Sequence, residues 1–267
     1  MRWAVTGPVG SNPTVSAMRP VKYDWSFYSS SRQERSMPLM HMRRKKWARP
    51  ELENCPYYRE FPEECKGNWA AQFPHAAPLH IELGCGKGVS TAQMTRDNPD
   101  INYLVIDLVR DVLGSARRNI EAAYGDRPVE NVIISALHIE YIYKYLGNGD
   151  QAERIYIQFC NPWTKRKKHE KRRLTHSRQL MQYRDFLKDG GEIWFKTDDD
   201  ELFDDALQYF AECGFTVRYL TRDLHQSGFT PNYQSEHEMM YSKKGVPIKF
   251  AIAVKGPLPE GTSPAME

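Results

Sequence analysis

A glycine-rich segment, HIELGCGKG at residues 80–88, constrains the fold of this 267-residue chain more than any other feature. It follows an apolar stretch typical of a β-strand and precedes an amphipathic stretch typical of a helix. Glycine there lets the backbone turn tightly and approach a ligand, and the next helix offers free N–H groups at its N-terminus. We therefore interpret Gly84, Gly86 and Gly88 as a ligand-binding turn, although ordinary turns in many folds share this spacing.

Two acidic residues accompany this turn. Glu82 stands two positions before the first glycine, and Asp107 stands 25 residues after Glu82, at the end of the next expected strand. A pyrophosphate would be repelled by Glu82, whereas the ammonium and sulfonium of S-adenosylmethionine are positively charged. Asp107 is placed to accept hydrogen bonds from ribose hydroxyls. The pattern favours a methyl-donor site over a dinucleotide site, with a solvated strand-end acid as the simpler alternative.

Short β-rich stretches alternate with amphipathic helical stretches from Pro78 onward, which is typical of a parallel sheet covered on both faces. We expect an α/β fold with a mostly parallel seven-stranded sheet and helices on both faces, its last two strands forming a closing hairpin. The expected strands are His80–Leu83, Tyr103–Asp107, Val132–Ala136, Arg154–Phe159, Glu192–Lys196, Phe215–Leu220 and Ile248–Val254. The expected helices are Val89–Arg96, Val109–Ala123, Ile139–Leu146, Ser177–Leu187 and Glu201–Glu212.

The length and composition suit one full-sized α/β domain, which we place at residues 78–256. Residues 1–40 show neither helical nor strand periodicity, and we expect a disordered extension. Residues 41–77 alternate basic, aromatic and proline positions, which predicts an extended arm outside the core, and we expect 257–267 to be a flexible tail. The five scattered cysteines form no C-x-x-C pair, so we expect a reducing compartment, the cytoplasm, and no metal. No apolar stretch is long enough to span a membrane.

A basic segment follows the fourth main strand. Seven of the eight charged side chains between Lys165 and Arg173 are basic, although the whole chain carries a net charge of only +3. Such a charged stretch is usually a solvated face. Here it must lie at the carboxyl end of the sheet, where ligands of parallel α/β folds gather, so we expect it to contact phosphates of a nucleic acid. Trp163 either stacks on a base or packs against the sheet edge.

Together these segments resemble the bacterial TrmB-type tRNA (guanine-N7)-methyltransferases, over residues 42 to about 255. MRRKKWARPEL resembles the start of the family's proteins, and HIELGCGKG resembles their donor loop. NPWTKRKKHEKRRL resembles the family's most specific block, normally P-D-P-W followed by a basic stretch. The segment 195–198 resembles the family's strand-end T-D, and 235–238 resembles its T-x-x-E block. The resemblance implies a Rossmann-like class I fold that uses S-adenosylmethionine.

The resemblance also implies roles for individual residues. It implies donor contacts from Glu82, Asp107, His138 and Asn161, with Asn161 as the catalytic position, and guanosine or tRNA contacts from Lys165, Asp198, Ser235 and Glu238. Three positions depart from the family's pattern. The family generally has aspartate where this chain has His138 and Asn161, and threonine where it has Ser235.

The expected activity is methyl transfer to N7 of guanosine at tRNA position 46, with tRNA as the partner. Because this chain has His138 and Asn161 where the family has aspartates, a catalytically weakened tRNA-binding homologue is one alternative. A methyltransferase for another small molecule or a protein is a second alternative, against which the basic segment argues. The sequence does not indicate an oligomeric state.

Overall fold

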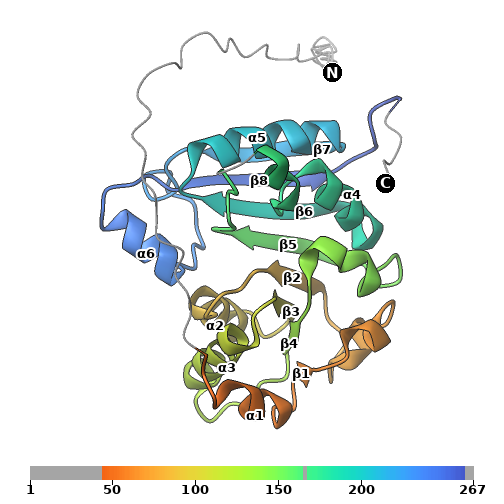
Figure 1. Ribbon diagram of the computed structural model, residues 1–267, viewed down its shortest axis with the longest axis vertical. Helices are drawn as coiled ribbons and strands as arrows, with labels where there is room; N and C mark the ends of the chain where they lie inside the picture. The colour runs from red at the N-terminus through yellow and green to blue at the C-terminus, as the bar shows by residue number, and fades with distance from the viewer. Residues whose placement is uncertain (1–43, 165–166, 262–267) are drawn as a thin grey trace, which may run out of the picture. The chain divides into compact units, whose positions relative to one another are not determined.

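The computed structural model describes residues 44–164 and 167–261, and these form an α/β structure around one twisted sheet (Figure 1). Its eight strands lie in the order β1-β4-β3-β2-β5-β6-β8-β7. The strands are β1 (Tyr58–Arg59), β2 (Leu79–Leu83), β3 (Asn102–Asp107), β4 (Val132–Ala136), β5 (Ala152–Gln158), β6 (Leu187–Thr197), β7 (Phe215–Thr221) and β8 (Lys249–Lys255).

The sheet is parallel from β1 to β6, and β8 is antiparallel to both of its neighbours, β6 and β7. The predicted hairpin between the last two strands is therefore confirmed, and β8 inserts between β6 and the edge strand β7. All seven predicted strands are present. The predicted strand count is wrong by one, because the two-residue β1 adds an eighth strand beside β4. So short a strand has no sequence periodicity of its own.

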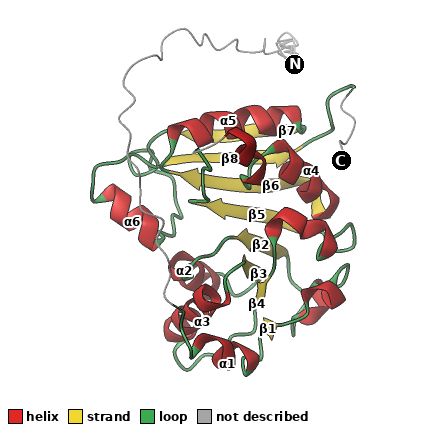
Figure 2. Ribbon diagram, viewed as in Figure 1, coloured by secondary structure: helices red, strands yellow, loops and turns green. Residues whose placement is uncertain are grey.

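Helices cover both faces of the sheet, as predicted (Figure 2). The α-helices are α1 (Ala48–Glu53), α2 (Val89–Asp97), α3 (Arg110–Tyr124), α4 (Ser177–Phe186), α5 (Asp200–Glu212) and α6 (Glu236–Ser242). The 3-10 helices are η1 (Pro62–Cys65), η2 (Ala70–Gln72), η3 (Ile139–Lys144) and η4 (Lys167–Arg172). One hydrophobic cluster joins η3, α4 and α5 to one face of the sheet, and a second joins α1, α2 and α3 to the other.

The side chains of β3 show why the interior of a central strand is mostly apolar. Leu104 and Ile106 belong to the cluster under α4 and α5, whereas Tyr103 and Val105 belong to the cluster under α2 and α3. Successive side chains of a strand point to opposite faces, so a strand covered on both sides favours apolar residues at consecutive interior positions. This preference explains why the parallel strands could be found from short apolar stretches.

Two predicted elements differ in the structure. The stretch predicted as the helix Ile139–Leu146 is the 3-10 helix η3, interrupted at Tyr141, whose backbone angles (φ −116°, ψ 35°) are not helical. Helix α6 lies in the segment between β7 and β8, where we predicted no helix. It has only seven residues, too few for a clear helical period.

The expectation of an extended arm outside the core is wrong for the described part of residues 41–77. This part contains α1 and β1, and Trp69 is fully buried in the cluster under α4 and α5. The Trp69 indole donates to the Tyr145 carbonyl at 2.8 Å, and the Asp150 carboxylate accepts from the backbone N–H groups of Gly67 and Trp69. The predicted extension at 1–40 and the end of the predicted tail, 262–267, lie outside the described residues.

Candidate active site

The carboxyl ends of the parallel strands bring the predicted site residues to one edge of the sheet. In the register of the strands, Leu83 pairs with Ile106 of β3 and Ile157 of β5, and Gln158 pairs with Lys196 of β6. The groups that follow these positions in sequence therefore meet there, which is where parallel α/β sheets bind ligands.

The glycine turn adopts the geometry predicted for it. Gly84, Gly86 and Gly88 all have positive φ, at +80°, +57° and +69°, a region that favours glycine. Gly88 is the N-cap of α2, and a Cβ atom added there would lie 2.8 Å from the Ala116 Cβ. This packing holds α2 against α3 directly behind the turn.

Asp107 ties the turn to the end of β3. Its Oδ2 accepts from the Gly86 N–H at 3.1 Å, and its Oδ1 accepts from the Val109 N–H at 3.0 Å. Burial raises the pKa of Asp107, although these backbone hydrogen bonds oppose the shift. The carboxylate is only partly exposed, and each oxygen keeps a second lone pair for a further donor.

Glu82 is 1% exposed at the end of β2. The Thr91 hydroxyl donates to its Oε2, and the Gln158 amide donates to its Oε1 at 3.0 Å. Burial raises the pKa of Glu82 to about 7, while the two hydrogen bonds and the Lys196 ammonium partly offset that rise. A buried carboxylate with so little countercharge favours a positively charged ligand.

Two polar atoms near this edge fit a ligand-binding role. The Gln158 Oε1 and the His138 Nδ1 are buried, and neither has a hydrogen-bond partner among the described residues. Buried polar atoms are almost always paired, so an unpaired one indicates a missing partner. Together with the glycine turn and Glu82, they fit a ligand that carries cationic and hydrogen-bonding groups.

The turn after β5 is held by Asn161. Its side-chain Oδ1 accepts from the Trp163 N–H at 2.9 Å, while the residue itself is exposed. Phe159 and Trp163 both have φ of 51°, an uncommon conformation for residues other than glycine. Strained backbone of this kind concentrates at functional sites.

Trp163 contacts other residues of its own loop. Its ring lies 5.2 Å from the Arg172 guanidinium and 6.0 Å from the His169 ring. Lys165 and Arg166 lie outside the described residues, so the structure does not place the predicted tRNA contact of Lys165.

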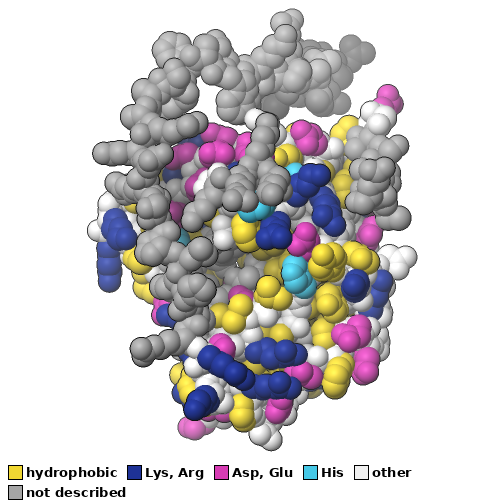
Figure 3. Space-filling model, viewed as in Figure 1, with side chains coloured by type: hydrophobic (Ala, Val, Ile, Leu, Met, Phe, Trp, Pro, Cys, Tyr) yellow, Lys and Arg dark blue, Asp and Glu magenta, His cyan; other side chains and the backbone are white. Residues whose placement is uncertain are grey.

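Arg173 corrects one expectation for the basic segment. Instead of facing phosphates it is fully buried, and its guanidinium donates to the Pro162 carbonyl at 2.6 Å and pairs with Asp205 and Glu201 of α5. Figure 3 shows other Lys and Arg side chains over the region of α1 and α3. Arg117 and Arg118 there are paired with Glu51.

The segment between β7 and β8 folds back over the same edge of the sheet. Ser235 is the N-cap of α6, where its hydroxyl accepts from the Glu238 N–H at 3.1 Å. The His237 Nε2 lies 3.3 Å from the Asp198 Oδ1, and the Lys87 Nζ lies 2.7 Å from the Glu236 carboxylate. Lys87 belongs to the glycine turn, so α6, the turn and the end of β6 are brought together.

Glu238 has no exposed surface. Its Oε1 accepts from the His225 Nε2 at 2.9 Å and from the Asn232 amide at 2.7 Å, and its Oε2 lies 3.1 Å from the Lys196 Nζ. Asp198, in contrast, keeps 23% of its side chain exposed. Of the two predicted acidic guanosine contacts, only Asp198 reaches the surface.

Four polar side chains of this region were not predicted from the sequence: Lys87, Gln158, Lys196 and His237. Gln158 and Lys196 occupy consecutive strand ends, and their position beside Glu82 was the available signal. Lys87 and His237 lie inside motifs that were recognised, but their contacts depend on how the β7–β8 segment folds back.

The chain is similar to known methyltransferases. A family model described as "Putative methyltransferase" matches residues 76–251. A tRNA (guanine-N(7)-)-methyltransferase of Clostridium botulinum (strain Eklund 17B) is 54% identical over 218 residues, which are 81% of this chain and 99% of that protein. The chain belongs to the tRNA (guanine-N(7)-)-methyltransferase family.

Further members of the tRNA (guanine-N(7)-)-methyltransferase family are similarly related. The Clostridium perfringens (strain 13) protein is 54% identical over 219 residues, covering 81% of this chain and all of that protein. The Desulfitobacterium hafniense protein is 49% identical over 218 residues, covering 80% and 97%. A solved antibiotic-related methyltransferase is 18% identical, with a TM-score of 0.45 over 68% of this chain and 88% of that one.

As a member of this methyltransferase family, the chain is an enzyme whose methyl donor is S-adenosyl-L-methionine. Glu82, the glycine turn and Asp107 fit that donor. Within the described residues no group of three or more His, Cys, Asp or Glu side chains forms a metal-binding cluster. No helix in residues 44–164 or 167–261 has the length and apolarity to cross a membrane.

Proposed function

We propose that this chain transfers a methyl group from S-adenosylmethionine to N7 of guanosine at tRNA position 46. The observation that carries the proposal is the meeting of two groups at one sheet edge. They are the buried Glu82 beside the glycine turn and the partly exposed Asp198 beneath α6. Glu82 suits the cationic methyl donor, and Asp198 suits the edge of a guanine that donates hydrogen bonds. Family membership supports the same substrate class.

Three groups would hold the methyl donor. Glu82 would attract its ammonium group, Asp107 would accept from its ribose hydroxyls, and the backbone of the glycine turn would let it approach closely. When bound, the donor supplies an electrophilic methyl group on a sulfonium. His138, with its unpaired Nδ1, is the proposed contact to the donor at the end of β4.

Guanine N7 already carries an in-plane lone pair, so the transfer needs no general base. The protein must instead align N7 with the methyl group and exclude water. Asp198 would accept hydrogen bonds from N1–H and the exocyclic amine, which fixes the base and offsets its developing positive charge. The Ser235 hydroxyl accepts from the Glu238 N–H and keeps its own proton to donate.

Asn161 is the proposed catalytic position, since its oxygen can orient the donor or the base. That oxygen already accepts from the Trp163 N–H, so it would use its second lone pair. Lys165 and its basic neighbours would bind tRNA phosphates. We further propose that the enzyme acts in the cytoplasm, where its substrate tRNA is found.

A transcript substituted at one atom tests the proposed target. Unmodified tRNA with guanosine at position 46 should accept a methyl group, whereas the same tRNA with 7-deazaguanosine at that position should accept none. Binding of the two transcripts should be equal, because the substitution leaves the phosphates and the Watson–Crick edge intact. Methylation of the 7-deaza transcript would exclude N7 of this guanosine as the target.

A variant series tests the role of Asn161. A charge-assisted hydrogen bond is about twice as strong as a neutral one, so Asn161→Asp should raise turnover several-fold. Asn161→Ala should lower turnover roughly ten-fold to a hundred-fold, the equivalent of about 1.5–3 kcal/mol. Melting temperatures control for disturbance of the turn. If Asn161→Ala matches the wild type, Asn161 is only a turn residue before Pro162.

A further inference from the structure

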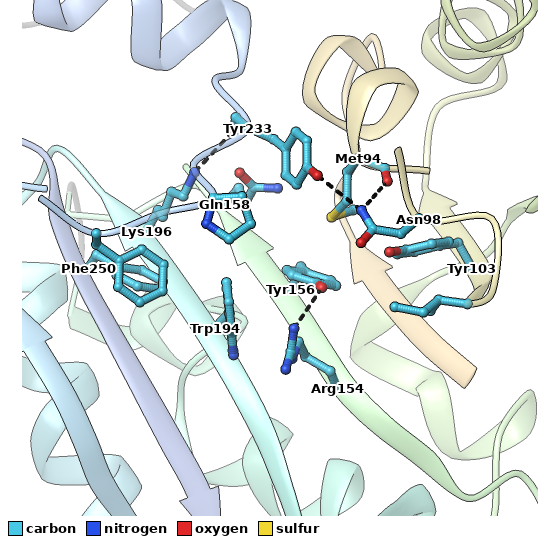
Figure 4. Close-up of a pocket in the computed structure, with 13 residues that line it drawn as sticks. Met94, Asn98, Tyr103, Arg154, Tyr156, Gln158, Trp194, Lys196, Tyr233 and Phe250 are labelled. Carbon is cyan, nitrogen blue, oxygen red and sulfur yellow. Dashed lines mark hydrogen bonds between the residues drawn. The ribbon is translucent and has the colours of Figure 1, made fainter. Parts of the chain in front are cut away.

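The Lys196 side chain holds the β7–β8 segment against the sheet. It is 9% exposed, and its Nζ donates to the Asn232 Oδ1, to the Tyr233 carbonyl at 3.1 Å and to the Glu238 Oε2 at 3.1 Å. Figure 4 shows Lys196 extending from β6 toward the segment that carries Tyr233. An ammonium has three hydrogens, so these three acceptors use its whole capacity.

A second link ties the same segment to α2. The Tyr233 hydroxyl accepts from the Asn98 amide at 3.0 Å, and the Asn98 amide also donates to the Met94 carbonyl at 2.7 Å (Figure 4). Helix α2 begins at the glycine turn, so the β7–β8 segment is attached both to β6 and to the helix behind the donor site.

The attached segment leads directly into α6. Asn232 and Tyr233 lie three and two residues before Ser235, the N-cap of α6, and Glu238 lies in the first turn of the helix. Glu238 is wholly buried and bonds to His225, Asn232 and Lys196, so it holds α6 in place. The placement of Ser235 and of His237, which contacts Asp198, therefore depends on the group that anchors Glu238.

We propose that Lys196 is a positioning residue for tRNA, which sets the place of α6 over the donor site by anchoring Asn232, Tyr233 and Glu238. The inference rests on the proposed function. It assigns the anchoring role to a lysine for which the family resemblance implied no contact. Its three acceptors all lie in the β7–β8 segment, whereas the Glu82 carboxylate acts on it only through charge. The main effect of losing Lys196 is therefore on the segment that faces tRNA.

The first test is Asn232→Ala, which removes one acceptor of Lys196 and one donor to Glu238 at a partly exposed position. We expect the KM for tRNA to rise about ten-fold, because the two hydrogen bonds that Asn232 makes in this anchor are lost. The melting temperature and the Kd for S-adenosylhomocysteine, measured by calorimetry, should stay at wild-type values. Gln226→Ala is the matched control, since Gln226 is an exposed residue of the same segment, and it should leave all three quantities unchanged.

The second test is Lys196→Met, which keeps the length of the side chain and removes its charge. It should raise the tRNA KM further than Asn232→Ala does. If this variant does not fold, Asn232→Ala decides alone. A wild-type tRNA KM in Asn232→Ala overturns the proposal. A rise in the tRNA KM together with weaker donor binding and a lower melting temperature also overturns it, because that pattern indicates general destabilisation.

Failure of the proposed function can be distinguished from failure of the positioning role. If the wild type does not methylate tRNA, the same variants are compared by direct tRNA binding. Weaker binding by Asn232→Ala than by Gln226→Ala would retain the positioning role without the reaction. Equal binding would overturn the positioning role as well.

Discussion

Replacing Glu82 by glutamine should remove the pH dependence of donor binding. Glu82 is buried, burial raises its pKa to about 7, and only its ionised form attracts the donor's ammonium group. The pKa is raised, so the carboxyl is mostly neutral below pH 7 and mostly ionised above it. Donor affinity should therefore fall as the pH is lowered through 7. The amide of Glu82→Gln has the same shape and does not titrate.

The size of the effect follows from this pKa. With a value of about 7, roughly one molecule in eleven is ionised at pH 6 and roughly ten in eleven at pH 8, so the donor Kd should rise about ten-fold on going from pH 8 to pH 6. Loss of a charge-assisted contact costs about 1.5–3 kcal/mol, so Glu82→Gln should bind the donor about ten-fold to a hundred-fold more weakly at pH 8.

Calorimetric titration with S-adenosylhomocysteine at pH 6, 7 and 8 measures both effects. Adenosine is the matched ligand, because it has the ribose and the base but no ammonium group, and its Kd should be nearly constant over this range. The groups that act on Glu82 through charge are Lys196 and Asp107, and Cys85 and Tyr156 also lie in its field. If Glu82→Gln keeps the wild-type pH profile, another of these groups titrates and our assignment of Glu82 is refuted.

Three further changes test other parts of the site. Gly88→Ala should lower the free energy of unfolding by about 1–3 kcal/mol in denaturant titrations and weaken donor binding. The new Cβ would lie 2.8 Å from Ala116, and the backbone φ of +69° disfavours alanine. Unchanged stability would contradict the close packing. A triple alanine variant of the basic segment, which replaces Lys165, Arg166 and Lys168, should bind tRNA more weakly. The slope of log affinity against log salt concentration should fall by about 0.9 per lost phosphate contact, or about 0.7 on single strands, and an unchanged slope would indicate a solvated face. A chain beginning at Met42 should keep the melting temperature and tRNA methylation of the full chain, and a clear loss in either would count against a dispensable extension.

The sheet could be predicted because its strands are covered on both faces. Strands such as β3 have an apolar interior, here residues 103–106, so short apolar stretches separated by amphipathic helices are enough to locate them. The glycine turn was predictable for a related reason: Gly84, Gly86 and Gly88 adopt backbone angles that favour glycine. Both signals are local in sequence.

The interior of the β7–β8 segment could not be predicted, because its contacts join residues far apart in sequence. Lys196 and Glu238 are 42 positions apart, and a sequence gives no sign that two such charges are buried together. Arg173 is a similar case, since a basic stretch predicts exposed charge but this guanidinium pairs with α5. Helix α6 is too short to show a period, and Ser235 was recognised from the family resemblance rather than as a helix cap.

The most direct measurement is nucleoside mass spectrometry of unmodified tRNA after incubation with the purified protein and S-adenosylmethionine. We expect 7-methylguanosine to accumulate, mapped to position 46 by digestion of the tRNA into fragments, and to be absent when the donor is omitted. Accumulation of a different methylated nucleoside, or no methylation by a folded protein that binds tRNA, would contradict the proposed activity.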